Sequence, residues 1–217
     1  MIINIIFFVA TLLIGDHLSV WLGVFYPDSP NFYIWQIITY MFMHGGFGHI
    51  FFNMFALVTF GSTIERVLGA KRYLNFYLIC GLGALVLQYG VQAFEVFQIS
   101  GSVMPLKQFG ESFVNNLSET DFKTLQSIYG TPMVGASGAI YGLLLAFGYL
   151  FPNMELMLIF FPIPIKAKYF IPILIVIEVY LGFSHSGSSI AHLAHVGGAL
   201  FGYIILKVWG IKRTNFY

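Results

Sequence analysis

The sequence predicts an all-α integral membrane protein with six transmembrane helices and a first loop that lies in the membrane interface. Composition is the first observation behind this prediction. Of the 217 residues, 58% are hydrophobic and only 9% are charged, whereas soluble domains carry about 25% charged residues. The second observation is that apolar stretches recur along the whole chain, and a spanning helix needs roughly 17–25 mostly apolar residues.

The first apolar stretch covers residues 1–14, or 1–24 if the polar run Gly15-Asp16-His17 is tolerated near the outer interface. It lacks the basic first region and the small-residue cleavage site of a secretory signal. The other five spans are expected at His49–Leu68, Tyr73–Phe94, Val134–Phe151, Tyr169–Phe183 and Ala191–Trp209. No repeat or linker divides the chain, so a single domain over residues 1–217 is expected.

Basic residues give the orientation of these spans. With the N-terminus in the cytoplasm, the cytoplasmic segments hold Arg66, Lys71, Arg72, Lys166, Lys168, Lys207, Lys212 and Arg213, and the outer loops hold Lys107 and Lys123. This asymmetry is what the positive-inside rule requires, and six spans place both termini in the cytoplasm. The absence of a targeting lead favours a bacterial inner membrane. The net charge of +1, without a basic stripe, indicates no nucleic-acid partner.

Three connections have distinct compositions. The first loop, residues 15–44, carries Trp21, Tyr26 and Trp35 among polar residues, and Trp and Tyr favour the headgroup level of a bilayer. The outer loop at 95–131 is polar and is expected to hold a short surface helix. The inner connection at 160–166 contains Pro162 and Pro164, which argue against a continuous helix there.

Ser137 is the most informative residue of the chain. It lies between small residues in Gly135-Ala136-Ser137-Gly138, in the first turn of the fourth span and below the outer surface. A helix N-terminus has free backbone N–H groups and a positive dipole end, which favour an oxyanion. Small residues also line ordinary contacts between membrane helices, so a packing patch is the alternative interpretation.

His195 in the sixth span favours catalysis. Each candidate residue is followed by two glycines four residues apart: Gly138 and Gly142 after Ser137, and Gly198 and Gly202 after His195. Such pairs let helix backbones approach closely, so Ser137 and His195 are expected within hydrogen-bond reach. A serine becomes a good nucleophile when an adjacent base takes its proton. A histidine that only stabilises helix contacts is the alternative.

Four further side chains are candidates for the same site. His49 and Asn53 share one face of the second span, and both can donate hydrogen bonds to an oxyanion. Polar contacts between helices are their alternative role. His44 is expected to brace the loop, and Tyr141 is expected to stack on the His195 ring, unless it is an ordinary core aromatic residue.

Other polar residues are given structural roles. His192 competes with His195 as the base, but it lies nearer the outer surface and an interfacial role is favoured. His185 is expected in solvent, and Cys80 is expected to be a buried structural thiol. Glu178 lies within the fifth span, where an acid is a functional candidate by default, but no partner is visible and a structural hydrogen bond is favoured. His192 and His195 could share one helix face and bind a metal, but no His-Glu-x-x-His run occurs and no acidic residue sits beside these two histidines in sequence, so no metal or other cofactor is expected.

Taken together, four ordered runs resemble the rhomboid family of intramembrane serine proteases over nearly the whole chain. The runs are His44-Gly45-Gly46-Phe47-Gly48-His49-Ile50-Phe51-Phe52-Asn53, Glu65-Arg66-Val67-Leu68-Gly69, Gly135-Ala136-Ser137-Gly138-Ala139-Ile140-Tyr141-Gly142, and Ala194-His195-Val196-Gly197-Gly198. The resemblance implies a six-helix bundle with a Ser–His dyad and no third acidic member. Ser137 would be the nucleophile and His195 the base, with oxyanion stabilisation by His49, Asn53 and the Ser137 backbone.

The resemblance also implies the substrates. They would be single-span membrane proteins that enter sideways past the fifth span and are cut in or near their transmembrane segment. A non-catalytic relative that binds transmembrane segments is the alternative function, although such relatives usually lack the serine or the histidine. One departure is Trp35-Gln36, where family members with the best-known first loop carry Trp-Arg, so the arginine brace of that loop is missing.

Overall fold

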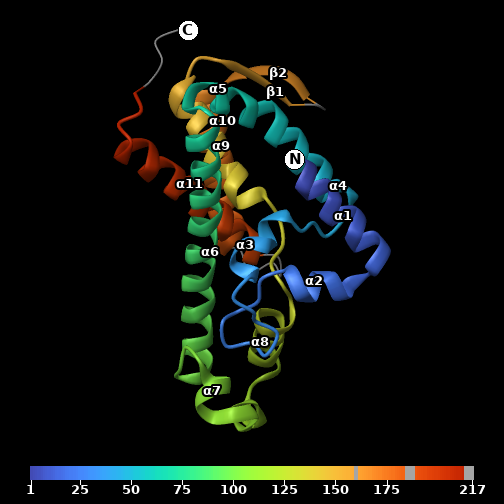
Figure 1. Cartoon of the computed structure of the whole chain (residues 1–217). Coiled ribbons are helices and arrows are strands. Elements are labelled where there is room, and N and C mark those ends of the chain that lie inside the picture. Colours follow the sequence, from blue (N-terminus) through green and yellow to red (C-terminus); the bar gives the residue numbers. More distant parts are fainter. Residues whose placement is uncertain (159–160, 184–188, 213–217) are drawn as a thin grey trace. The chain divides into compact units, whose positions relative to one another are not determined.

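The computed structural model describes residues 1–158, 161–183 and 189–212, and these residues are mostly helical (Figure 1). They form two compact units. The first contains Met1–Ile50 and Val86–Ala136, and the second contains Phe51–Leu85 and the chain from Ser137 onward. Helices α4 (Phe47–Ala56) and α6 (Ala70–Ser100) contribute residues to both units.

The first apolar stretch forms two helices in the first unit rather than one. Helix α1 (Ile2–Ile14) ends at Gly15, and α2 (Asp16–Leu22) follows directly. Gly15 has φ 85°, a left-handed conformation that glycine adopts without steric cost. The extension of the first helix to residue 24 is therefore wrong, because the backbone turns at Gly15.

Gln36 organises the first loop, which continues through α3 (Gln36–Thr39) and the 3₁₀ helix η1 (Tyr40–Phe42). Its side chain is fully buried. The Nε2 donates to the carbonyls of Asn31, Val20 and Trp21 at 2.9, 3.1 and 3.4 Å, and Oε1 accepts from the Tyr33 N–H at 3.0 Å. The glutamine at this position thus braces the loop that was expected to lack its brace.

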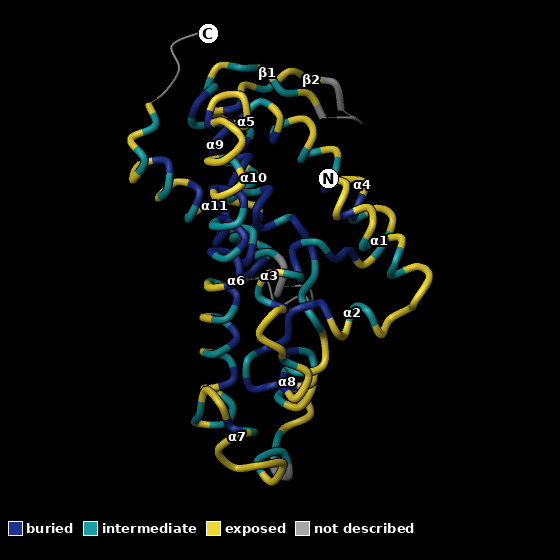
Figure 2. Tube along the Cα trace, viewed as in Figure 1, coloured by how far each residue is buried: buried dark blue, intermediate teal, exposed yellow. Residues whose placement is uncertain are grey.

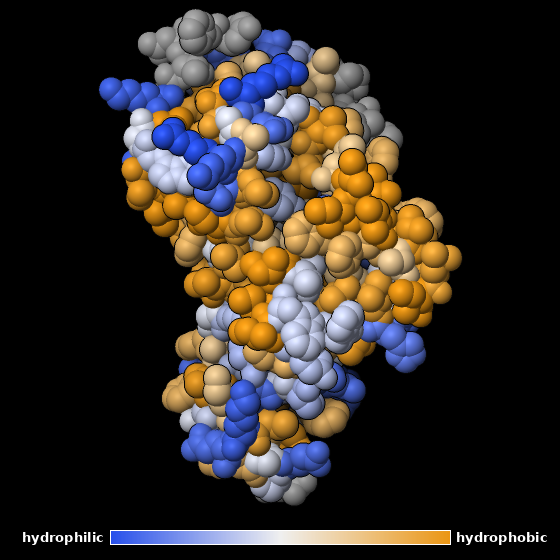
Figure 3. Space-filling view, in the orientation of Figure 1, coloured by the Kyte–Doolittle hydropathy of each residue, from blue (hydrophilic) through white to orange (hydrophobic). Residues whose placement is uncertain are grey.

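The outer loop is helical along most of its length. After α6 it contains α7 (Pro105–Phe109), the 3₁₀ helix η3 (Gly110–Asn116) and α8 (Glu119–Gly130). Ser118 caps α8 by accepting from the Asp121 N–H, so the predicted surface helix is confirmed. In Figure 3, the surface over α7 and α8 mixes hydrophilic and hydrophobic side chains, whereas hydrophobic side chains cover α1.

Asp28 ties the outer loop to the first loop within the first unit. This buried carboxylate accepts from the N–H groups of Leu106 and Lys107 at 2.8 and 3.2 Å and from the Tyr129 hydroxyl at 2.8 Å. Burial, together with the bond to Asp28, raises the pKa of Tyr129. Burial and the Asp28 charge raise the pKa of Tyr26 to about 12.

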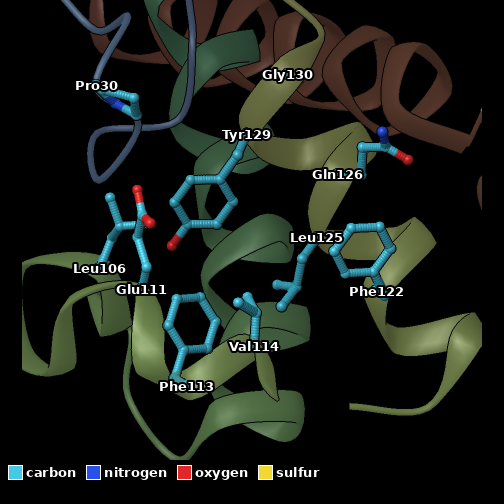
Figure 4. A pocket seen from close by; sticks show the side chains of 10 residues that line it. All are labelled: Pro30, Leu106, Glu111, Phe113, Val114, Phe122, Leu125, Gln126, Tyr129 and Gly130. Atoms are coloured by element: carbon cyan, nitrogen blue, oxygen red, sulfur yellow. The ribbon is translucent and has the colours of Figure 1, made fainter. Parts of the chain in front are cut away.

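A pocket of about 310 Å³ opens beside α8 in this unit. Figure 4 shows the side chains of Phe113, Leu125 and Tyr129 around it. Its lining is mainly apolar, and it contains none of the residues expected to carry catalysis.

The second unit has α9 (Ser137–Leu150) at its centre, and nine residues of this helix are buried (Figure 2). The predicted second span contains α4, a π-helical segment η2 (Leu57–Gly61) and α5 (Ser62–Leu68). The last two spans correspond to α10 (Ala167–Phe183) and α11 (Ser189–Val208).

The inner connection differs from an all-α architecture. Strands β1 (Glu155–Leu158) and β2 (Phe161–Lys166) pair antiparallel, with Glu155 opposite Lys166. Proline lacks the N–H that a helix needs and fits edge strands, so Pro162 and Pro164 favour this hairpin. The strand agrees with the prediction that no continuous helix forms at this connection, and the described chain is otherwise mostly helical.

Glycines bring α9 and α11 into direct backbone contact. A Cβ added at Gly198 would lie 1.8 Å from the carbonyl oxygen of Gly138, and one at Gly202 would lie 3.0 Å from the Gly142 Cα. Only glycine leaves room for such an approach. The close approach that the glycine spacing predicted is therefore confirmed.

Two of the described segments are long and apolar enough to cross a membrane. They are Phe47–Leu68 and Ala70–Val114. Shorter apolar helices lie at Ile2–Ile14, Ser137–Leu150 and His192–Val208.

Candidate active site

Ser137 is the first residue of α9. The chain enters this helix through Gly135, whose φ of 132° would strain any other residue. The Gly135 N–H donates to the carbonyl of Tyr40 at 2.9 Å within the first unit. The backbone N–H groups of the first turn of a helix have no partner inside that helix, so Ser137 stands where an anion is favoured.

His195 in α11 meets Ser137 directly. Its Nε2 lies 2.8 Å from the Ser137 Oγ, a normal hydrogen-bond length. The side chain is 15% exposed. The two residues are 58 positions apart in the chain, and the glycine contact between α9 and α11 allows them to meet.

Tyr141 lies one turn after Ser137 and packs on the His195 ring. The two ring centroids are 4.3 Å apart and the planes are tilted by only 5°. This is the stacked contact that the sequence predicted, and it restricts rotation of the imidazole. The Tyr141 hydroxyl in turn donates to Glu178.

Glu178 in α10 has partners that the sequence does not reveal. Its Oε2 lies 3.0 Å from the Nδ1 of His195 and 2.6 Å from the Nδ1 of His192. An acid inside an apolar span marks Glu178 as a functional candidate, but the sequence favours a structural hydrogen bond for it. Its partners lie on other helices, so no spacing along the chain reveals them.

His192, for which an interfacial role was favoured, contacts the same carboxylate as His195. Its side chain is 21% exposed and hydrogen-bonded to Glu178. Its ring stands perpendicular to that of His195, with centroids 6.3 Å apart. Of the two histidines, His195 is the one hydrogen-bonded to Ser137. His185, expected in solvent, lies outside the described residues.

The cluster of Glu178, His192 and His195 must also be tested as a metal site, because its three ligand-type atoms lie within 4.8 Å of one another. Tetrahedral zinc with ligand bonds of about 2.0–2.1 Å holds its ligand atoms roughly 3.3 Å apart. Glu178 lies 2.6 and 3.0 Å from the two histidine nitrogens. Both distances are shorter than the spacing of zinc ligands and match hydrogen bonds between the carboxylate and the two imidazole rings.

The predicted oxyanion residues fall in two units. His49 belongs to the first, where its Nδ1 accepts from the Gly45 N–H at 3.4 Å and its ring meets that of His44 edge to face. His44 is buried, and burial together with His49 lowers its pKa to about 4, so it stays neutral. Asn53 belongs to the second unit; it is 6% exposed, and its Nδ2 has no hydrogen-bond partner among the residues that the structure describes.

Comparison with known proteins places the chain in a family. A family model described as the rhomboid domain matches residues 31–211. This chain is a member of the rhomboid family. The matched residues include every candidate residue of the site. The candidate site therefore lies within the rhomboid domain of a mostly helical membrane protein.

Several rhomboid proteins are similar over most of the chain. Rhomboid protease GluP of Bacillus subtilis is 29% identical over 83% of the chain, and rhomboid protease AarA of Providencia stuartii is 29% identical over 79%. Rhomboid protein 1, mitochondrial, of Saccharomyces cerevisiae is 29% identical over 82%. The chain covers 27%, 54% and 42% of the lengths of these three relatives, respectively.

Proposed function

We propose that this rhomboid protein is an intramembrane serine endopeptidase with Ser137 as nucleophile and His195 as general base. The observation that carries the proposal is the hydrogen bond of 2.8 Å between the Ser137 Oγ and the His195 Nε2. A nucleophile and a base within hydrogen-bond reach, with the base oriented by a third group, are the signature of covalent hydrolysis. The similarity to two proteins named rhomboid proteases supports the proposal.

The reaction follows from these contacts. His195 Nε2 removes the proton from Ser137 Oγ as the oxygen bonds to the carbonyl carbon of the scissile peptide. The imidazolium then gives this proton to the leaving amine, the C–N bond breaks, and an acyl-enzyme forms. Water, deprotonated by His195, attacks the ester and releases the carboxylic acid, and Ser137 regains its proton.

The oxyanion of the tetrahedral intermediate would be stabilised by the Ser137 N–H, His49 and Asn53. The N-terminal position of Ser137 on α9 supports the backbone contribution. Because the His49 Nδ1 accepts a hydrogen bond from Gly45, a neutral ring carries its proton on Nε2, which suits a donor. Within the described residues, the buried Nδ2 of Asn53 is a donor without a partner, and such a group suits a ligand that is bound only during the reaction.

The proposed substrates are single-span membrane proteins, cleaved in or near the transmembrane segment. An intact helix keeps its carbonyls in internal hydrogen bonds, so the substrate helix would unwind locally to reach Ser137. We further propose six spans with both termini in the cytoplasm. The proposed location is a bacterial inner membrane; the bacterial relatives support it, while the mitochondrial relatives provide the alternative.

Cleavage in liposomes tests the proposal. The purified protein should cleave a labelled single-span substrate, and Ser137→Ala and His195→Ala should each abolish cleavage without lowering the thermal midpoint. Ser127→Ala, a serine-to-alanine change in α8 of the outer loop, is the matched control and should cleave normally. Equal cleavage by the wild type and Ser137→Ala would contradict the proposal.

A serine-directed fluorophosphonate separates the protease from the alternative function. The alternative is a non-catalytic rhomboid protein that binds transmembrane segments. A protease labels covalently at Ser137, and the label disappears in Ser137→Ala. A folded wild-type protein that binds a substrate segment but neither labels nor cleaves would support the non-catalytic function.

A further inference from the structure

The carboxylate of Glu178 lies among three hydrogen-bond donors from two neighbouring helices. Its Oε1 accepts from the Tyr141 hydroxyl of α9. Its Oε2 faces the Nδ1 atoms of His195 and His192 of α11 at 3.0 and 2.6 Å. The Glu178 side chain is only 11% exposed.

The donors and acceptors of this cluster determine the histidine tautomers. An ionised carboxylate can only accept hydrogen bonds, so both Nδ1 atoms must carry the protons that they share with Glu178. In a neutral His195 ring, Nε2 is then the unprotonated nitrogen. That nitrogen lies 2.8 Å from the Ser137 Oγ. A general base requires this tautomer, because the unprotonated nitrogen must face the hydroxyl whose proton it accepts.

We propose that Glu178 is the third member of a Ser137–His195–Glu178 triad, acting as a positioning residue through His195. This inference rests on the proposed protease function and goes beyond the Ser–His dyad that the family resemblance implies. Glu178 holds the catalytic tautomer and orientation of His195, while His192 and Tyr141 hold the carboxylate in place.

Charge gives Glu178 a second effect during the reaction. When His195 takes the serine proton, its ring becomes a cation between packed helices, where an unpaired charge is costly. The carboxylate 3.0 Å from Nδ1 offsets this new charge. Because a general base takes up its proton only during the reaction, this attraction is stronger in the transition state than in the ground state and lowers the barrier.

Glu178→Gln tests the triad because it keeps the size of the side chain and removes its charge. The two readouts are the rate of fluorophosphonate labelling of Ser137 and the kcat and KM of substrate cleavage. An amide in place of the triad carboxylate lowers kcat by about 10⁴ in the serine protease that serves as the type case. We expect a loss of about 10²–10⁴ in labelling rate and kcat with little change in KM, and partial recovery in Glu178→Asp.

Glu155→Gln is the matched control, since it makes the same change at an exposed position of the second unit. It should label and cleave as the wild type does. If Glu178→Gln is folded and labels and cleaves at the wild-type rate, the triad is overturned and the dyad stands. If the wild type itself neither labels nor cleaves, the proposed protease function fails instead.

A measurement that needs no activity keeps the triad falsifiable if Glu178→Gln does not fold. In Ser137→Ala protein with ¹⁵N-labelled histidine, NMR at neutral pH should find His195 protonated on Nδ1 and unprotonated on Nε2. The opposite tautomer would overturn the triad whatever the activity of the protein.

Discussion

At the scale of single residues, Asn53 has a buried side-chain donor that is free to bind a reaction intermediate. Its Nδ2 makes no hydrogen bond to any part of the chain that is described, and a buried donor without a partner costs about 1–3 kcal/mol. We predict that Asn53→Ala lowers kcat by about ten- to a hundredfold, less than the 10²–10³ seen for a single dominant donor, because His49 and the backbone remain. Cleavage kinetics in liposomes measure this effect.

Asn75→Ala is the control for this prediction. It removes the same amide from an exposed position of α6 in the same unit, and it should leave kcat unchanged. A wild-type kcat for Asn53→Ala would remove Asn53 from the oxyanion hole.

The cluster around Glu178 leads to a second residue-scale prediction. Its ligand-type atoms are close enough to invite a divalent ion, yet two of the distances are 2.6 and 3.0 Å, as hydrogen bonds require. We predict that overnight dialysis against a strong chelator leaves the cleavage rate within about twofold of the untreated rate, because hydrolysis by a serine needs no metal. A loss that added zinc restores would show that the cluster works as a metal centre.

At the scale of elements, the glycine contact between α9 and α11 sets the distance between Ser137 and His195. A methyl group at Gly198 would lie 1.8 Å from the Gly138 carbonyl oxygen, so the helices must separate. Overpacking typically costs about 1–3 kcal/mol, and a shift of about 1 Å between reacting groups costs about a hundredfold in rate. We predict that Gly198→Ala lowers both the thermal midpoint and kcat.

Gly90→Ala is the matched control, since, apart from the adjacent backbone of α6, no atom of the described residues lies within 4 Å of the position that its Cβ would take. It should be neutral or slightly stabilising, because alanine favours a helix over glycine. If Gly198→Ala behaves as Gly90→Ala does, the helix contact does not control the site.

The same elements show how far sequence reasoning reaches. The place of Ser137 at a helix start and the approach of the glycine faces follow from local patterns, and the structure has both. Glu178 did not follow, because its bonds to Tyr141, His192 and His195 join three helices and depend on how α10 packs against the other two. The comparison with arginine predicts that the first loop lacks a brace at Gln36. The amide of Gln36 nevertheless braces the loop, because it can both donate and accept and so binds several backbone groups at once.

At the scale of the whole molecule, the arrangement of charge along the chain predicts its orientation in the membrane. Eight of its ten basic residues fall in segments assigned to the cytoplasm, and such a bias sets the orientation of membrane proteins. If six spans are present, Lys71 and Lys212 lie on the cytoplasmic side and Lys123, in α8, lies on the outer side. An odd number of spans, or a reversed insertion, would distribute these three positions differently.

Cysteine accessibility tests this topology. The one native cysteine, Cys80, is fully buried and should stay silent toward a membrane-impermeant maleimide, whereas Lys71, Lys123 and Lys212 are exposed. In spheroplasts, Lys123→Cys should label at once, and Lys71→Cys and Lys212→Cys should label only after permeabilisation. Labelling of Lys212→Cys together with Lys123→Cys would show that an odd number of spans separates residues 71 and 212. Labelling of all but Lys123→Cys would show that the protein is inserted in the opposite direction, with the end of α9 that carries Ser137 nearest the cytoplasm.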